Sequence, residues 1–156
     1  MRVLAALGAA LALASCAGSR APVSAPPVHG VVSIEVSPNP ILAVSAGPNL
    51  YDFPFDVIIR ETGGRPLQIR NVVATMFAFA GMKVGSESHG AADLKGRGFA
   101  TEVAAHGELR YHFAPQQGVP DVRLFAGVSA TLEVDAVDDT GAATTASVHL
   151  TVKSSS

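Results

Sequence analysis

Residues 128–136, Val-Ser-Ala-Thr-Leu-Glu-Val-Asp-Ala, carry the strongest indication of fold class in this chain. Apolar and polar residues alternate along them, which predicts a β-strand with one face in a core and the other in water. Residues 146–152, Ala-Ser-Val-His-Leu-Thr-Val, repeat the alternation, and Asp138-Asp139-Thr140-Gly141 lies between as a turn sequence. The C-terminal end is therefore expected to be an antiparallel hairpin.

The same period of two recurs upstream of this hairpin. Along 67–80, β-branched and aromatic residues favour a strand that bends near Asn71, although the length would also suit a helix. The further ranges predicted as strands are 31–37, 41–45, 51–61, 99–104 and 108–113, with 115–120 as a connection. The side chains expected to face the core are Phe55, Val57, Leu132, Val134, Val148 and Leu150.

The run from Val134 to Gly141, with its return over 146–152, resembles the last hairpin of bacterial immunoglobulin-like domains. The resemblance implies an all-β, immunoglobulin-like or fibronectin type III-like antiparallel β-sandwich over 31–153, followed by a disordered tail over 154–156. Roughly seven short strands in about 125 residues are what such a sandwich requires. The chain has one cysteine and no tryptophan, so the Cys–Trp–Cys core of antibody domains is absent.

The N-terminal residues are predicted to form a targeting signal. Arg2 precedes an apolar segment, 3–13, that is too short to span a bilayer. The segment ends in Leu13-Ala14-Ser15-Cys16, which resembles the lipobox of bacterial lipoproteins. The resemblance implies that the helical signal peptide, 1–15, is removed and that Cys16 carries acyl chains that anchor the protein to a membrane. Ala12-Leu13-Ala14 would also fit an ordinary secretory cleavage site, which would leave Cys16 as an unpaired thiol.

A tether is predicted between the anchor and the domain. Residues 16–30 are rich in proline, alanine and serine, and they hold too little apolar bulk to offset the entropy of ordering. Ala17 follows the cysteine where an aspartate often signals inner-membrane retention, so the lipoprotein resemblance implies the outer membrane if the source is Gram-negative. We therefore expect a lipid-anchored protein of the bacterial cell envelope.

Composition narrows the classes of partner. Of the 156 residues, 140 follow Cys16, which is enough for one domain. Charged residues make up 15%, the formal net charge is −2, and no basic stripe for nucleic acid is present. The expected partners are therefore the membrane, through lipid on Cys16, and a protein or glycan of the envelope, with no nucleic acid.

Residues 81–98 differ from their surroundings because five glycines punctuate them. They are predicted to form a long loop with one helical turn over 91–95. Long loops in compact domains are usually functional or disordered, so this one is either the binding surface or a tolerated insertion. The polar residues predicted to make the contacts are Lys83, Glu87, His89, Asp93, Lys95 and Arg97.

No catalytic motif or cofactor site is expected. Ser86-Glu87-Ser88-His89-Gly90 fails the G-x-S-x-G pattern of hydrolases at its first position. His106 and His112 could share a strand face, but no H-E-x-x-H pair supports a metal site. The aspartates Asp135, Asp138 and Asp139 could offer oxygens to calcium, although aspartate is also a favoured turn residue.

Three functional hypotheses follow from different classes of protein. The first is a membrane-tethered, non-catalytic immunoglobulin-like module that binds a partner or assists assembly in the envelope. The second is a small periplasmic metal-binding protein that uses His106 and His112. The third is a hydrolase that uses Ser88 and His89. The anchor, the tether and the missing catalytic motifs favour the first.

Overall fold

The C-terminal hairpin forms as predicted. In the computed structural model, which describes residues 28–155, β10 (Ser129–Asp138) pairs antiparallel with β11 (Ala143–Ser154), and Leu132 lies opposite Val148. The predicted signal peptide, Cys16 and most of the predicted tether lie outside the described residues. At the other end, β11 continues to Ser154, and Ser155 donates two hydrogen bonds to the carbonyl of Ala43.

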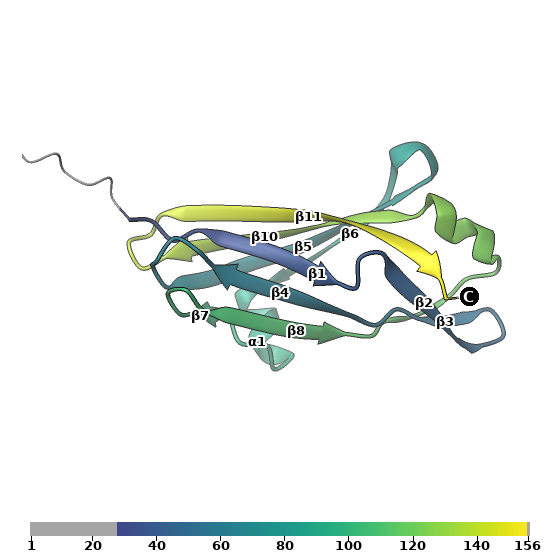
Figure 1. Cartoon of the computed structure of the whole chain (residues 1–156), viewed down its shortest axis with the longest axis horizontal. Coiled ribbons are helices and arrows are strands. Elements are labelled where there is room, and N and C mark those ends of the chain that lie inside the picture. The colour runs from purple at the N-terminus through teal and green to yellow at the C-terminus, as the bar shows by residue number, and fades with distance from the viewer. Residues whose placement is uncertain (1–27, 156) are drawn as a thin grey trace, which may run out of the picture.

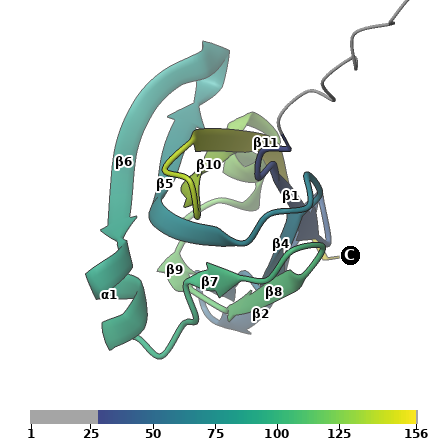
Figure 2. The same ribbon diagram turned by 90° about the vertical axis from the view of Figure 1, so that its left-hand side faces the viewer.

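The strands form two sheets that curl around one core as a half-barrel (Figure 1, Figure 2). The smaller sheet has the order β1-β4-β8, and the larger has the order β6-β5-β10-β11-β2-β3-β9, with β7 paired to β5. The strands of the smaller sheet are β1 (Val32–Ser37), β4 (Phe55–Glu61) and β8 (Glu108–Phe113). Besides β10 and β11, the larger sheet and its side strand contain β2 (Ile41–Gly47), β3 (Leu50–Asp52), β5 (Leu67–Ala78), β6 (Met82–Gly90), β7 (Glu102–Val103) and β9 (Gln116–Gly118).

Within the part of the chain that the structure describes, three short helices connect the strands. They are η1 (Phe79–Gly81), α1 (Ala91–Gly96) and η2 (Val122–Gly127). Within residues 28–155, none of the helices has the length and apolar character needed to cross a membrane.

Side chains from both sheets meet in a single core. Val57 of the smaller sheet and Ile69 and Val134 of the larger sheet are at most 1% exposed. All six side chains predicted to face inward are confirmed: Val57, Leu132, Val134 and Leu150 are buried, and Phe55 and Val148 pack against them partly buried. Removing this apolar surface from water stabilises the fold by about 25 cal/mol per Å². The predicted all-β class is therefore confirmed.

Residues 51–61, which were predicted as one strand, are split between the two sheets. β3 ends at Asp52 in the larger sheet, and β4 begins at Phe55 in the smaller. Pro54 lies at the crossing, where its missing N–H cannot continue a ladder. The predicted connection over 115–120 also contains a strand, because β9 pairs with β3.

The larger sheet departs from a purely antiparallel arrangement. β11 pairs with β2 in parallel, with Val152 opposite Ile41. The predicted strand over 67–80 is confirmed as β5, and its register against β10 shifts between Ile69 and Asn71, at the place where a bend was predicted.

The prediction of a long loop over 81–98 is wrong, except for its helical turn. Residues 82–90 form β6, an edge strand that pairs with β5 and places Glu87 opposite Ala74. Most side chains of β6 are exposed, so the strand has no apolar alternation by which its sequence could reveal it. Backbone pairing with β5 holds β6 in place, and the turn that precedes β6 has positive φ angles at Ala80 and Gly81. The helical turn is α1, whose Leu94 is buried in the core.

Candidate functional site

Four of the six predicted contact residues form one polar cluster on β6 and α1. Glu87 and His89 share a face of β6 because they are two residues apart, and Asp93 and Arg97 lie four residues apart around α1. His89 Nε2 lies 2.9 Å from Glu87 Oε1, and His89 Nδ1 is bonded to Asp93 Oδ2. Arg97 Nε donates to Asp93 Oδ1 at 3.3 Å. The hydrogen bond from His89 lowers the pKa of the Asp93 carboxyl.

The remaining two contact residues lie elsewhere. Lys83 stands near the opposite end of β6, and Lys95 lines a shallow groove together with Arg70 and Glu102. The predicted set therefore does not converge on one site. The side chains of this polar cluster contact one another on an exposed surface, where such contacts add little stability.

The side chains needed for the alternative chemistries are not brought together. Ser88 Oγ donates to Asn71 Oδ1 at 2.8 Å, and adjacent strand residues point to opposite faces, so Ser88 does not meet His89. His112 Nδ1 lies 2.8 Å from Asp56 Oδ1, whereas His106 lies in a turn beside Glu61. Across residues 28–155, no group of three or more His, Cys, Asp or Glu side chains is placed to hold a metal ion.

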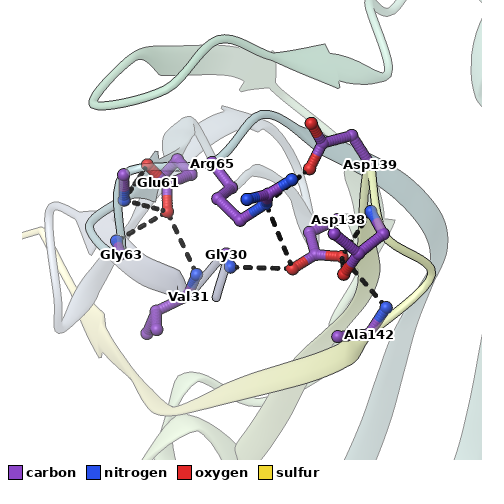
Figure 3. Close-up of polar contacts among 10 residues, drawn as sticks. Gly30, Val31, Glu61, Gly63, Arg65, Asp138, Asp139 and Ala142 are labelled. Atoms are coloured by element: carbon purple, nitrogen blue, oxygen red, sulfur yellow. Dashed lines mark hydrogen bonds and ion pairs between the residues drawn. The ribbon is translucent and has the colours of Figure 1, made fainter. Parts of the chain in front are cut away.

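A buried carboxylate at the end of β4 anchors the start of the domain (Figure 3). Glu61 is 2% exposed, and its oxygens accept hydrogen bonds from the backbone N–H groups of Val31, Gly63, Gly64 and His106. Burial alone would raise the pKa of this carboxyl, but the four donors outweigh it and hold the pKa at about 2. Glu61 therefore stays ionised and fixes Val31 to the loop that follows β4.

A second buried carboxylate, at the end of β10, holds the neighbouring residue. Asp138 Oδ2 accepts from the N–H of Gly30 at 3.0 Å, and Oδ1 accepts from Thr140 and from the N–H of Ala142 (Figure 3). The Thr140 hydroxyl, followed by the Gly30 N–H, holds the pKa of this carboxyl well below its ordinary range. Arg65 Nε lies 4.0 Å from Asp138 and 2.7 Å from Asp139.

These contacts assign Asp138 to the turn and argue against the calcium reading. Both of its oxygens already accept hydrogen bonds, Asp139 pairs with Arg65, and Asp135 accepts from the Thr145 hydroxyl. Glu61 and Asp138 instead bind the backbone of Val31 and Gly30 from the two sheets, and we call this pair of carboxylates the clamp.

Gly30 is required at the clamp because the space is full. A Cβ atom there would lie 2.5 Å from Leu67 Cδ2 and 2.8 Å from Asp138 Cβ. The clamp was not predicted, since Glu61 and Asp138 read from sequence as a strand end and a turn residue. The Gly-Gly pair at 63–64 was the available signal, because consecutive glycines leave backbone N–H groups free to approach a carboxylate closely.

The opposite end of the molecule holds an apolar cavity of about 440 Å³. Its lining residues come from β9 and η2 and from the strands β2, β5, β10 and β11 of the larger sheet. Ile41, Phe125 and Leu150 are buried among its lining residues, whereas Met76, Leu124 and Val128 are 36–46% exposed. None of the residues that line the cavity, all within 28–155, carries a charge. The sequence could not reveal the cavity, because its walls come from six separate segments.

The chain matches no known protein-family model and no curated protein sequence. Among solved structures it is similar to the Northeast Structural Genomics Consortium target SoR45, with a TM-score of 0.52 and 13% identity over 77% of this chain and 86% of that chain. It is also similar to the putative ApaA protein from Bordetella pertussis, with a TM-score of 0.51 and 13% identity over 81% of this chain and 98% of that chain. At this level of identity the likeness concerns the fold alone.

Proposed function

We propose that this chain is a non-catalytic binding module of the bacterial cell envelope. Its N-terminal signal peptide is removed, lipid on Cys16 anchors it to the membrane, and residues 17–30 tether the domain. In a Gram-negative source the anchor lies in the outer membrane. The domain is an immunoglobulin-like β-sandwich whose partner is a molecule of the envelope.

The observation that supports this proposal is that the two ends of the domain differ. The clamp holds Gly30, the last residue of the proposed tether, and Val31 at one end of the domain (Figure 3). The uncharged cavity lies at the other end. A tethered receptor benefits from this arrangement, since its binding end points away from its anchor. Because the clamp fixes Gly30 and Val31, the proposed tether joins the domain at a fixed point immediately before β1.

The scattered polar chemistry also agrees with a binding role. Ser88 donates to the side-chain amide oxygen of Asn71, and His112 contacts the carboxylate of Asp56. His89 lies between the carboxylates of Glu87 and Asp93. The experiment that tests the proposal is fractionation of cells expressing the wild type and Cys16→Ser, combined with the mass of the N-terminal peptide.

A further inference from the structure

We propose that the cavity beneath η2 binds a single aliphatic chain of an uncharged amphiphile. This inference names a class of ligand for the proposed binding module, and the location of that ligand in the cell envelope rests on the proposed function.

The walls exclude a charged or strongly polar ligand from the interior. The polar side chains among the lining residues are Gln117 and Ser129. Gln117 is exposed and Ser129 is half-buried, so the buried part of the wall offers a charged ligand group no partner of opposite charge. A charged group placed there would lose its hydration without gaining a partner, which is costly.

The aromatic rings favour an aliphatic ligand over a planar one. Phe125 meets Tyr51 edge-to-face at 5.2 Å and Phe53 at 5.9 Å between ring centroids. These rings are engaged with one another and do not form a slot for stacking. Among the other lining side chains, Ile41 and Leu150 are aliphatic and Met76 is a thioether.

The size and the rim agree with one chain entering end-on. A volume of about 440 Å³ lies within the range of small-molecule pockets. Met76, Leu124 and Val128 expose apolar surface around it, so a chain can pass from water over an apolar rim to the buried floor. The head group of the ligand then stays at the rim, where water solvates it.

The test measures binding of monoacylglycerols to the purified full-length chain carrying Cys16→Ser, below their critical micelle concentrations. This variant lacks the proposed acylation site, so the result does not depend on whether the wild type is lipidated. Titration calorimetry should show one saturable site, with affinity rising by up to about fourfold per added methylene and reaching a plateau once the cavity is full.

A matched pair of leucine variants locates the site. Leu124→Lys places a charge on the rim, whereas Leu42→Lys does so at a similarly exposed leucine, 43% against 37%, that does not line the cavity. Leu124→Lys should weaken binding at least about tenfold, and Leu42→Lys should leave it unchanged. Val128→Lys, at 36% exposure, gives the same test if Leu124→Lys lowers the melting temperature. Two results would overturn the inference. One is the absence of saturable binding, which is expected if the true occupant is a partner protein. The other is equal affinity in the rim and control variants.

Discussion

The backbone N–H of Gly30 donates a hydrogen bond of 3.0 Å to the carboxylate of Asp138, a residue 108 positions later in the chain. This contact ties the first described residues to the turn between β10 and β11 (Figure 3). Glu61 makes the corresponding contact with Val31 from β4. The start of the domain is therefore held from both sheets, and its stability should depend on two carboxylates.

Replacing Glu61 by glutamine should destabilise the protein. The amide keeps one acceptor oxygen, but its NH₂ group then faces backbone N–H donors, such as those of Gly64 and His106 that donate to Glu61 Oε2 in the wild type. We expect a loss of about 2–4 kcal/mol in the free energy of unfolding, measured by urea denaturation. The control is Glu133→Gln, at an exposed position of β10, which should change stability by less than about 0.5 kcal/mol. Equal stabilities of the two variants would contradict the clamp.

Stability should also depend on pH through the clamp. The pKa of Glu61 is about 2 in the folded chain against an ordinary 4.5, and the pKa of Asp138 is also lowered. A lowered pKa gives stability that is present above the ordinary value and is lost as the pH falls through the folded value. Denaturation curves should therefore agree between about pH 7 and 5 and shift to lower denaturant between about pH 4.5 and 2. The shift should be smaller in Glu61→Gln, and an identical pH profile would argue against Glu61 as its source.

Gly30→Ala tests how tightly the clamp is packed. The added Cβ would meet Leu67 Cδ2 at 2.5 Å and Asp138 Cβ at 2.8 Å, so neighbouring atoms must shift. We expect a loss of about 1–3 kcal/mol in thermal or chemical denaturation. Gly96→Ala is the matched control, because nothing lies within 4 Å of its added Cβ and helical alanine is favoured over glycine. If both variants melt like the wild type, Gly30 is not confined as described.

Leu132→Ala tests the shared core. Leu132 is 7% exposed on β10, and its truncation should cost about 2–5 kcal/mol, because the cavity left behind adds to the lost burial. Leu42→Ala, at 43% exposure, should cost less than about 1 kcal/mol in the same urea titration. A loss below about 0.5 kcal/mol for Leu132→Ala would mean that the faces of β10 are reversed.

The strands that could be predicted are those with one buried and one solvated face. In β10 the polar residues Thr131, Glu133 and Asp135 separate apolar ones, so periodicity located both the strand and its inward side chains. β6 lacks this property because it extends beyond the core at the edge of the sheet. Its pairing with β5 uses backbone groups, which are the same in every sequence, so its side chains do not indicate a strand. Its glycine-rich composition suggested a loop instead.

The candidate site was less predictable because its parts are distant in sequence. Glu87, His89 and Asp93 were named together because all three lie within 81–98, and they are neighbours along β6 and α1 rather than in a loop. The clamp joins residues on β4 and β10 to Gly30 and Val31, and the cavity joins β2 to η2. Such contacts depend on strand order and on the parallel pairing of β2 with β11, neither of which periodicity encodes.

The most direct measurement of the central proposal is the location of the protein after Cys16→Ser. The wild type should sediment with membranes, and its N-terminal peptide should carry the added mass of acyl chains on Cys16, since two or three chains are needed for firm anchoring. Ser15→Ala is the control, because a small residue before the cysteine keeps the lipobox pattern, and it should remain in the membrane fraction. Cys16→Ser should move to the soluble fraction with its domain folded. Retention of Cys16→Ser in the membranes, together with an N-terminal peptide of the wild type that carries no lipid mass, would contradict the proposal.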